Sequence, residues 1–499
     1  MSYTILGALR WWAREMPDRM ALDIDGDSVS YGELWDWSRA IASQLRAKGV
    51  GVGDRIGLIG GQSTPLFAIA LGAQHIGAIA LPINTRFTER ELAASFEDGG
   101  VCIVFAEPEL RARALAAASE KVPVEDIEIV RGWRASDPIE KTDSFDPDRT
   151  TLIALMMTSG STARPKMVQF NHDMVVSIAL ELQLIEPRVR HGRCLLFAPP
   201  FSGGLYTTFE YLVLGCSCFV QHRFEPDEAL RIIEREKITV MPGATVFLER
   251  MAASPFFAET DLSSIAWATV GGARVPRELV ETFRAKGMML RCLFGQTEAG
   301  AAWAATGEAL DHPEQAGYCG PFSDWKVVAG DRDAEAGEDG EIVIRSASVT
   351  PGYWQNDEAT RETLREGWLH TGDIGRMSVD GSLTFVDRAK DIIISGGLNI
   401  SAAEVEQAIG ELPEIEEVAV IAAADEKFGE TPMAIVRSGG RLDVAALIAH
   451  CNANLANYKV PRYVIEAEEP LPRNASGKIV KPILREIYAS QARQRERVR

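Results

Sequence analysis

The stretch from Thr158 to Lys166 has the composition of a polyphosphate-binding loop. It consists of Thr158, Ser159, Gly160, Ser161, Thr162, Ala163, Arg164, Pro165 and Lys166. It follows an apolar run, Leu152 to Met157, that predicts a buried strand. Backbone amides and hydroxyls can donate to phosphate oxygens, and the lysine can neutralise charge. The loop is not a Walker A motif, because Pro165 and Met167 flank the lysine. The alternative interpretation is a polar surface loop.

Two further stretches could bind parts of a nucleotide. The run Phe294-Gly295-Gln296-Thr297-Glu298 ends in a carboxylate that could hold Mg²⁺, since this ion prefers oxygen ligands. A surface or salt-bridged carboxylate is the alternative. Gly271, Gly272 and Ala273 follow an apolar run, and glycines let the backbone approach a flat ring closely. A double glycine is, however, usually a simple turn.

The C-terminal third carries other polar groups in turns. Asp373 follows a tight turn and could accept both hydroxyls of a ribose, although a turn-forming role is the alternative. The charged run from Asp387 to Asp391 is typical of a solvated linker. Lys478 ends a glycine-containing stretch and could reach into a cleft as a point charge, whereas a surface lysine is the plainer interpretation.

The elements that must position these residues alternate between helix and strand. Helices are expected at 31–48 and 65–75, and strands at 55–59, 78–81, 101–105, 193–197, 238–241 and 265–270. Such alternation predicts a layered α/β fold with a parallel sheet. From about Gly340, short strands at 341–344 and 383–386 predict a β-rich subdomain. From Lys390 a last unit is expected, with helices at 402–409 and 443–455 and a strand at 418–422.

Composition narrows the class of protein. The chain has 499 residues, and a single core stops growing at roughly 250–300 residues, so at least two domains are expected. The net charge of −19 argues against a protein that coats nucleic acid. Seven scattered cysteines predict buried thiols in a reducing cytoplasm rather than disulfides. The N-terminus is not typical of a signal peptide, and no apolar run is long enough to span a membrane.

Taken in order, the motifs resemble the adenylate-forming superfamily of acyl- and aryl-CoA synthetases, peptide-synthetase adenylation domains and firefly luciferase. The resemblance covers nearly the whole chain, from Ser30–Leu34 through Pro82–Arg86 to Lys478. Gly340–Ile342 and Gly352-Tyr353-Trp354 also match. It implies a layered αβαβα N-terminal domain with a distorted β subdomain, residues 1–388. A small mobile α+β domain, residues 389–499, would then rotate about a hinge at Lys390.

The resemblance also implies roles for individual residues. Lys478, Glu298 and Thr158 would be catalytic, and Glu298 would hold Mg²⁺. ATP or AMP would be bound by Thr158, Ser159, Gly160, Ser161, Thr162, Lys166, Gly271, Gly272, Ala273, Phe294, Gly295, Gln296, Thr297, Asp373 and Arg388. Lys478 would contact both the carboxylate and the α-phosphate.

A thiol would then attack the acyl-AMP, and coenzyme A is the expected acceptor. Arg86, Gly396, Gly397, Phe428 and Tyr458 match positions near CoA in such enzymes, with core packing the alternative for the two aromatic residues. ATP, Mg²⁺ and CoA are therefore the expected cofactors, and a small carboxylic acid is the expected substrate. Such enzymes are often dimers, so a homodimer is a further expectation.

The chain departs from the family pattern at two places. Ala163 and Met167 stand where glycine is usual, which implies a less mobile loop. Ser202 stands where the family has a gating histidine, unless that histidine is deleted. The expected acyl pocket comprises Phe201, Ser202, Tyr206, Gly300 and Ala301, with Ala273 and Trp303 beside it. Its small residues indicate a deep pocket.

Alternative functions stay open at this point. The acyl group could pass to the phosphopantetheine of a free carrier protein. The 21 residues after Lys478 are too few for a fused carrier domain. A luciferase-like oxidation is more remote. In a different class, the chain could bind nucleotide without catalysis, although Glu298, Asp373, Arg388 and Lys478 argue against that.

Overall fold

The computed structural model describes most of the chain, and its contacts divide the chain into two units. The described residues are 3–135, 137–138, 145–158, 165–186, 189–265, 267–271, 275–299, 303–304, 315–395, 398–425, 428–440, 442–473 and 478–488. The first unit comprises Met1–Trp325 and Ile344–Leu369, and the second comprises Lys326–Val343 and His370–Arg499. By contacts, residues 370–388 thus group with the C-terminal part. The domain boundary after residue 388 stays a prediction.

The first unit contains a six-stranded sheet that is parallel except at one edge. In spatial order its strands are β6 (Val124–Asp126), β5 (Val101–Ala106), β3 (Arg55–Ile59), β4 (Ile79–Pro82), β7 (Leu152–Thr158) and β8 (Lys166–Asn171). Only β8 runs antiparallel to its neighbour, because a short loop joins it directly to β7. The apolar runs in the sequence form these strands because both faces of the sheet are covered.

An eight-stranded sheet completes the first unit. Its order is β14 (Trp303–Ala304), β13 (Leu290–Phe294), β12 (Trp267–Gly271), β11 (Val240–Ala244), β9 (Arg193–Leu196), β10 (Ser217–Val220), β1 (Met20–Ile24) and β2 (Asp27–Ser30). The strands from β13 to β1 are mutually parallel, and the two edge strands are antiparallel. The carboxyl ends of β9, β11, β12 and β13 therefore lie along one edge.

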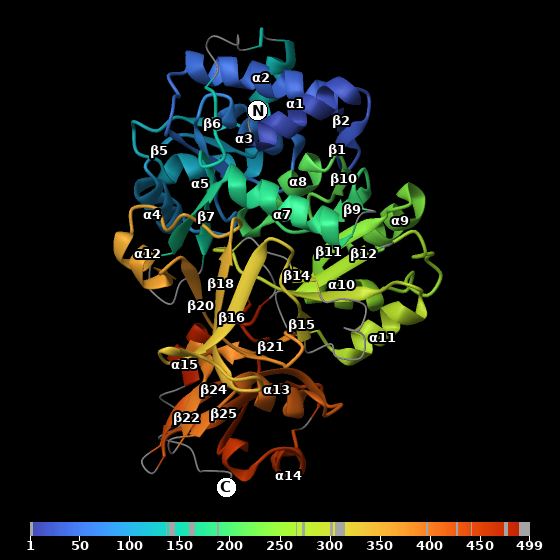
Figure 1. Cartoon of the computed structure of the whole chain (residues 1–499), viewed down its shortest axis with the longest axis vertical. Coiled ribbons are helices and arrows are strands. Elements are labelled where there is room, and N and C mark those ends of the chain that lie inside the picture. Colours follow the sequence, from blue (N-terminus) through green and yellow to red (C-terminus); the bar gives the residue numbers. More distant parts are fainter. Residues whose placement is uncertain are drawn as a thin grey trace. The chain divides into compact units, whose positions relative to one another are not determined.

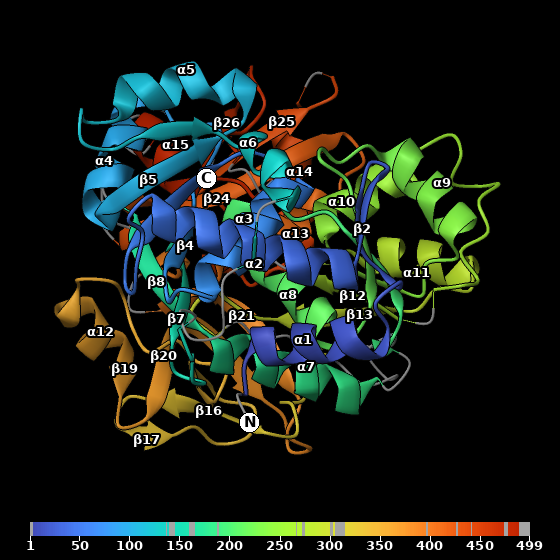
Figure 2. The same ribbon diagram turned by 90° about the horizontal axis from the view of Figure 1, so that it is seen from above.

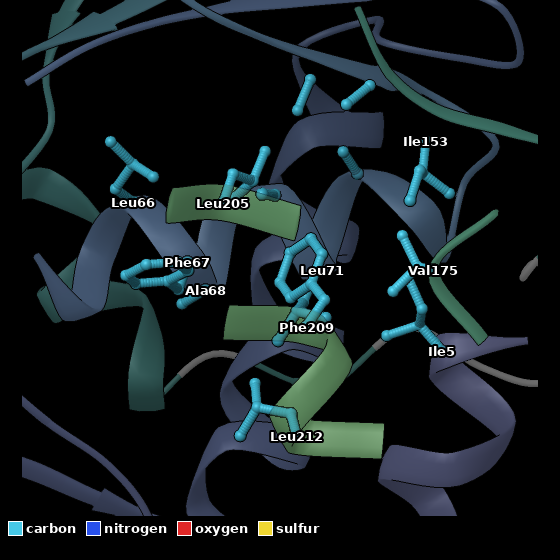
Figure 3. Close-up of a cluster of buried hydrophobic side chains, with 14 of the residues drawn as sticks. Ile5, Leu66, Phe67, Ala68, Leu71, Ile153, Val175, Leu205, Phe209 and Leu212 are labelled. Carbon is cyan, nitrogen blue, oxygen red and sulfur yellow. The ribbon is translucent and has the colours of Figure 1, made fainter. Parts of the chain in front are cut away.

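Helices fill the space between the two sheets and cover their outer faces. They are α1 (Ile5–Glu15), α2 (Tyr31–Ala47), α3 (Thr64–Gln74), α4 (Glu89–Gly99), α5 (Pro108–Ala117), α6 (Ile129–Gly132), α7 (His172–Ile185), α8 (Gly204–Val213), α9 (Pro226–Glu236), α10 (Thr245–Ala252), α11 (Arg277–Ala285) and α12 (Asp357–Thr363). All residues of α3 are buried, which is why its sequence is apolar on every side. Figure 3 shows residues of α3 and α8 in one buried cluster, in which the ring centres of Phe67 and Phe209 lie 6.3 Å apart.

These contacts define five layers in the first unit. The central cluster joins residues of both sheets through α3, α7 and α8. A second cluster packs α9, α10 and α11 on the outer face of the eight-stranded sheet, and a third packs α4 and α5 on the other sheet. Both views place α4 and α5 on the opposite side of this unit from α9 and α11 (Figure 1, Figure 2). The predicted αβαβα arrangement is confirmed.

A set of short strands links the units along the chain. They are β15 (Gln315–Gly317), β16 (Ser323–Ala329), β17 (Arg332–Asp333), β18 (Asp339–Ser346), β19 (Leu364–Arg365), β20 (Trp368–Met377) and β21 (Leu383–Arg388). Within the second unit, β20 and β21 form an antiparallel pair that places Asp373 opposite Arg388. The predicted β-rich subdomain is present.

The C-terminal part has its own small sheet and core. Its strands are β22 (Ile393–Ser395), β23 (Leu398–Ile400), β24 (Ile415–Asp425), β25 (Gly429–Ser438) and β26 (Tyr463–Glu466), and its helices are α13 (Ala402–Gly410), α14 (Val444–Asn454) and α15 (Lys481–Tyr488). One cluster packs α13 and α14 on the sheet, and a second cluster includes Leu484 of α15. This is the expected α+β unit.

Two expectations from composition can be compared with the structure. Five cysteines are buried, but Cys102 and Cys319 are only partly buried, so the expectation that all seven are buried is wrong for these two. Cys102 lies in β5, and Cys319 lies in an irregular segment after β15. Among the described residues, no helix combines the length and the apolar character that crossing a membrane requires.

Candidate active site

Several predicted site residues of the first unit follow the carboxyl ends of neighbouring parallel strands. Phe201, Ser202 and Tyr206 come after β9, Gly271 ends β12, and the run from Phe294 to Glu298 begins at the end of β13. Ligands of open α/β sheets bind at this edge, because the loops there diverge to either side. The strand order β13-β12-β11-β9 therefore brings stretches that are far apart in sequence to one place.

The predicted phosphate loop is the connection of a hairpin in the other sheet. Thr158 ends β7, Lys166 begins β8, and the two are opposite each other in the ladder. The Thr158 hydroxyl donates to the backbone carbonyl of Lys166 at 3.3 Å. Ser159, Gly160, Ser161, Thr162 and Ala163 lie outside the described residues. The hairpin thus positions the two ends of the loop.

Tyr353 joins the hairpin to Glu298. The segment around it pairs with β8, where the Gln169 amide donates to the Gly352 carbonyl at 3.0 Å and the Trp354 amide donates to the Met167 carbonyl at 2.8 Å. The Tyr353 hydroxyl donates to Oε1 of Glu298 at 2.8 Å. Lys166 Nζ lies 4.8 Å from the centre of the Tyr353 ring. A lysine, a tyrosine and a carboxylate are therefore gathered beside the loop.

Tyr353 acts as a spacer rather than as an acid. Its burial and the adjacent Glu298 charge raise the pKa of its hydroxyl well above the ordinary value, so it remains a donor at neutral pH. The ring offers its face to the Lys166 ammonium group. Lys166 and Glu298 thus both contact Tyr353, one at the face of its ring and the other at its hydroxyl.

At the end of β12, the backbone of Gly271 lies very close to the neighbouring strand β13. A Cβ added at Gly271 would lie 2.7 Å from the side chain of Leu293 and 2.9 Å from its carbonyl oxygen. Only glycine therefore fits here without a shift of the neighbouring strand. Gly272 and Ala273 lie outside the described residues, so their predicted place beside an adenine stays a prediction.

The stretch after β13 contains an unused hydrogen-bond donor. Ala299 donates its amide to the Gln296 carbonyl at 3.1 Å, which closes a turn, and the Thr350 amide donates to the Glu298 carbonyl at 2.7 Å. Among the described residues, the buried Nε2 of Gln296 has no hydrogen-bond partner. Buried polar groups are normally paired. A ligand that brings an acceptor to this position would satisfy it.

The residues present fit a magnesium ion shared with a polyphosphate. In the part of the chain that the structure describes, no group of three or more acidic, histidine or cysteine side chains is arranged so that it could hold a metal ion by itself. Magnesium sites of nucleotide enzymes commonly use one or two carboxylates, with phosphate oxygens and water as the other ligands. Glu298 can supply one carboxylate, and bound magnesium would neutralise part of the triphosphate charge.

The second unit has its own group of predicted site residues. Asp373 on β20 is buried, with 7% of its surface exposed, and its Oδ1 lies 3.6 Å from Nε of Arg388 on β21. Gly372 precedes it with φ of +68°, a conformation that favours glycine. The Glu341 carboxylate accepts from the Gly372 amide at 3.0 Å and contacts His370 Nδ1 at 2.7 Å. Glu341 thus holds the turn that presents Asp373 through a hydrogen bond to the turn's backbone.

Lys478 belongs to the same group. Burial and the positive charge of Arg388 lower the pKa of Lys478 to about 8, while the charge of Asp373 acts in the opposite direction. These influences require all three side chains to be neighbours. The residues predicted to contact ribose and the α-phosphate are therefore brought together in this unit.

We expect Lys478 to impose a pH limit on the reaction. A lysine with a pKa of about 8 is charged below that pH and loses its charge as the pH rises through it. The value of kcat/KM for pyrophosphate release, which reports the free enzyme, should fall above a midpoint near pH 8. Lys478→Arg should lack this fall, because arginine stays protonated. The same fall in both proteins would contradict the assignment.

The predicted hinge residue lies beside the C-terminal helix. Partial burial and the nearby Arg388 lower the pKa of Lys390. Arg485 of α15 donates to the Lys390 carbonyl at 3.4 Å and forms an ion pair with Asp391. The hinge role itself stays a prediction.

The predicted CoA residues are more scattered. Arg86 is exposed, and its amide donates to Asn84 Oδ1 at 3.0 Å. The guanidinium carbon of Arg462 lies 4.2 Å from the centre of the Phe428 ring, and Tyr458 packs on the C-terminal core. Gly396 and Gly397 lie outside the described residues, as do Gly300 and Ala301 of the predicted acyl pocket.

Sequence reasoning missed the role of Tyr353. It had only matched the triplet Gly352-Tyr353-Trp354 to a family pattern. The contact with Glu298 depends on the pairing of residues 352–354 with β8, which links segments about 185 residues apart in sequence (168 to 353). No local periodicity predicts such a pairing.

The comparisons with known proteins agree with this arrangement. A family model described as AMP-binding enzyme matches residues 9–354, and one described as AMP-binding enzyme C-terminal domain matches residues 404–478. The chain therefore belongs to the family of AMP-binding enzymes.

Named relatives are similar along almost their full length. A feruloyl-CoA synthase of an Amycolatopsis species is 32% identical, over 95% of this chain and 97% of its own. A Mycobacterium tuberculosis ligase, 3-[(3aS,4S,7aS)-7a-methyl-1,5-dioxo-octahydro-1H-inden-4-yl]propanoyl:CoA ligase, is 33% identical over 97% and 99%. The Bacillus subtilis o-succinylbenzoate CoA synthetase, solved with its acyl-adenylate intermediate, is 27% identical with a TM-score of 0.87, over 96% and 97%.

Proposed function

We propose that the protein joins a carboxylic acid to coenzyme A at the expense of ATP, through an acyl adenylate. The observation that carries this proposal is the grouping of Lys166 and Glu298 about Tyr353, beside a loop rich in hydroxyls and glycine. Relatives similar over their whole length are named as CoA ligases and synthetases. They support coenzyme A as the acceptor.

In the first half-reaction a carboxylate oxygen attacks the α-phosphorus of ATP. The bond from this phosphorus to the bridging oxygen breaks, and pyrophosphate leaves with the electron pair. Both reactants are anions, so the chain must offset their repulsion. Lys166 and the loop donors bind phosphate oxygens, Asp373 accepts from the ribose hydroxyls, and Lys478 places its charge on the α-phosphate and the carboxylate. A magnesium ion held by Glu298 would supply further positive charge.

In the second half-reaction the thiol sulfur attacks the acyl carbonyl. The bond between that carbon and the AMP oxygen breaks, AMP leaves, and the thiol proton passes to solvent. We propose that the small domain turns about Lys390 between the two steps, so that Lys478 withdraws before the thiol enters. Exclusion of water protects the mixed anhydride meanwhile.

The test is pyrophosphate release across aromatic, polycyclic, short-chain and long-chain acids, each with and without CoA. Sustained release that requires both an acid and CoA is the expected result, and the active acids identify the substrate class. Release with acid that CoA does not accelerate would instead favour a carrier-protein acceptor. ATP binding without any release would favour a nucleotide-binding homologue without catalysis.

We expect Ser202 to influence which acids are accepted. Its side chain is exposed, and its hydroxyl donates to the Pro199 carbonyl at 3.4 Å. Ser202→Phe should lower kcat/KM for bulky acids by about tenfold or more, through steric exclusion, with small acids little affected. Ser202→Ala is the matched control. An unchanged acid profile in Ser202→Phe would contradict a gating role.

A further inference from the structure

Helix α8 carries a buried carboxyl group that none of the steps above uses. Glu210 has only 6% of its surface exposed, and its buried Oε1 has no hydrogen-bond partner among the residues that the structure describes. Burial raises the pKa of Glu210 well above the usual range, and no cation in the described part of the chain opposes this. An isolated carboxylate is very costly in such surroundings, so Glu210 is a neutral carboxylic acid.

Glu210 lies on the opposite side of α8 from Leu205 and Leu212, two of the residues that pack in the core. Leu205, Phe209 and Leu212 point into the cluster between the two sheets (Figure 3). At about 100° per residue, Glu210 is turned by about 140° from Leu205. Tyr206, one turn earlier, shares its face, because residues four apart are neighbours on a helix.

This face of α8 adjoins the candidate active site. The Tyr206 ring stacks on Phe170 of β8 with centroids 4.8 Å apart, on the same strand that begins with Lys166. Tyr206 interacts electrostatically with the carboxyl groups of both Glu210 and Glu298, so the tyrosine lies near both of them. Tyr206 is partly exposed, whereas Glu210 is buried. Tyr206 thus lies near Glu298 of the candidate site and next to Glu210 on α8.

We infer that Glu210 determines specificity by donating a hydrogen bond to an uncharged oxygen, a ketone or hydroxyl, at the end of the acid remote from its carboxylate. This inference rests on the proposed function. A neutral carboxyl group offers one O–H donor and a carbonyl acceptor. A substrate with a hydrocarbon end would leave both unpaired after water is displaced, which is costly. A second carboxylate would bring an unpaired charge into the same apolar surroundings.

The test compares acids that differ by one oxygen. The probes are 3-(4-oxocyclohexyl)propanoate against 3-cyclohexylpropanoate, and 4-hydroxycinnamate against cinnamate, with kcat/KM measured for pyrophosphate release. The unmodified protein should prefer the oxygenated member of at least one pair. Glu210→Met, which is similar in size but has no donor, should reduce that preference by about 10- to 100-fold. Glu210→Gln keeps a donor and should retain most of it.

A second buried glutamate provides the matched control. Glu181 on α7 accepts from the Phe322 amide at 2.8 Å and from the Ser323 hydroxyl at 2.9 Å, so it is already satisfied. Glu181→Gln should leave the preference between the paired acids unchanged. Thermal unfolding and ATP binding of each variant verify that it is folded.

The outcomes separate the inference from the proposed function. Equal preference in the unmodified protein and folded Glu210→Met would overturn the inference and leave the ligase function intact. No preference for oxygen in the unmodified protein would overturn it as well. No release with any acid would contradict the proposed function and remove the inference with it. A Glu210→Met protein that loses only the oxygenated acids supports it.

Discussion

Replacing Lys478 by alanine should abolish adenylation while sparing the thiol-transfer step. The change removes a positive charge that lies beside Arg388 and Asp373. The α-phosphate and the incoming carboxylate would then lose a donor placed where charge develops. Loss of one such donor typically costs ~10²–10³ in rate. The measurement is acid-dependent exchange of pyrophosphate into ATP.

The second half-reaction provides the internal control for this variant. Lys478→Ala supplied with synthetic acyl-AMP and CoA should form thioester at close to the normal rate, since that step does not need the α-phosphate charge. Lys478→Arg should recover part of the adenylation, because it restores a cation of different shape. Equal loss of both half-reactions in folded Lys478→Ala would contradict the assigned role.

Replacing Lys390 by proline should have the opposite pattern. Proline fixes φ at this position and restricts the residue before it, so rotation of the backbone about the proposed hinge is blocked. Pyrophosphate exchange should stay within about twofold of normal, whereas thioester formation should fall by more than about tenfold. Both can be measured on one preparation.

The control for the hinge is a change that keeps the backbone free. Lys390→Ala removes the side chain and its charge but leaves φ unrestricted, so it should retain thioester formation. Normal overall turnover of Lys390→Pro would refute the hinge role. Equal loss in Lys390→Ala and Lys390→Pro would assign the effect to the lysine side chain instead of the backbone.

Most of the first unit could be predicted from local pattern. The run Arg55–Ile59 forms β3 with the expected bounds, and the expected strand at 101–105 is β5, Val101–Ala106. Their apolar character reflects burial on both faces, and the helices between them force parallel pairing. The expected helix at 31–48 is α2, which begins at a capping box of Ser30 and Glu33.

Side-chain contacts between distant segments could not be predicted in this way. The position of Glu298 against Tyr353 depends on tertiary pairing with β8. Glu210 is one charged residue in a largely apolar helix, a pattern equally consistent with a solvent-facing position. Its burial follows from the packing of α8, which no local rule contains. The acid-binding end of the site is therefore where sequence reasoning was weakest.

The central claim is that acid and ATP react through an acyl adenylate, and an isotope measurement tests it most directly. An active acid labelled with oxygen-18 in its carboxylate is converted with unlabelled ATP and CoA, and the AMP is analysed by mass spectrometry. The attacking oxygen stays on phosphorus when the thiol cleaves the acyl carbon–oxygen bond. Each AMP should therefore carry one labelled oxygen. Unlabelled AMP, or label in inorganic phosphate with release of ADP, would contradict the account.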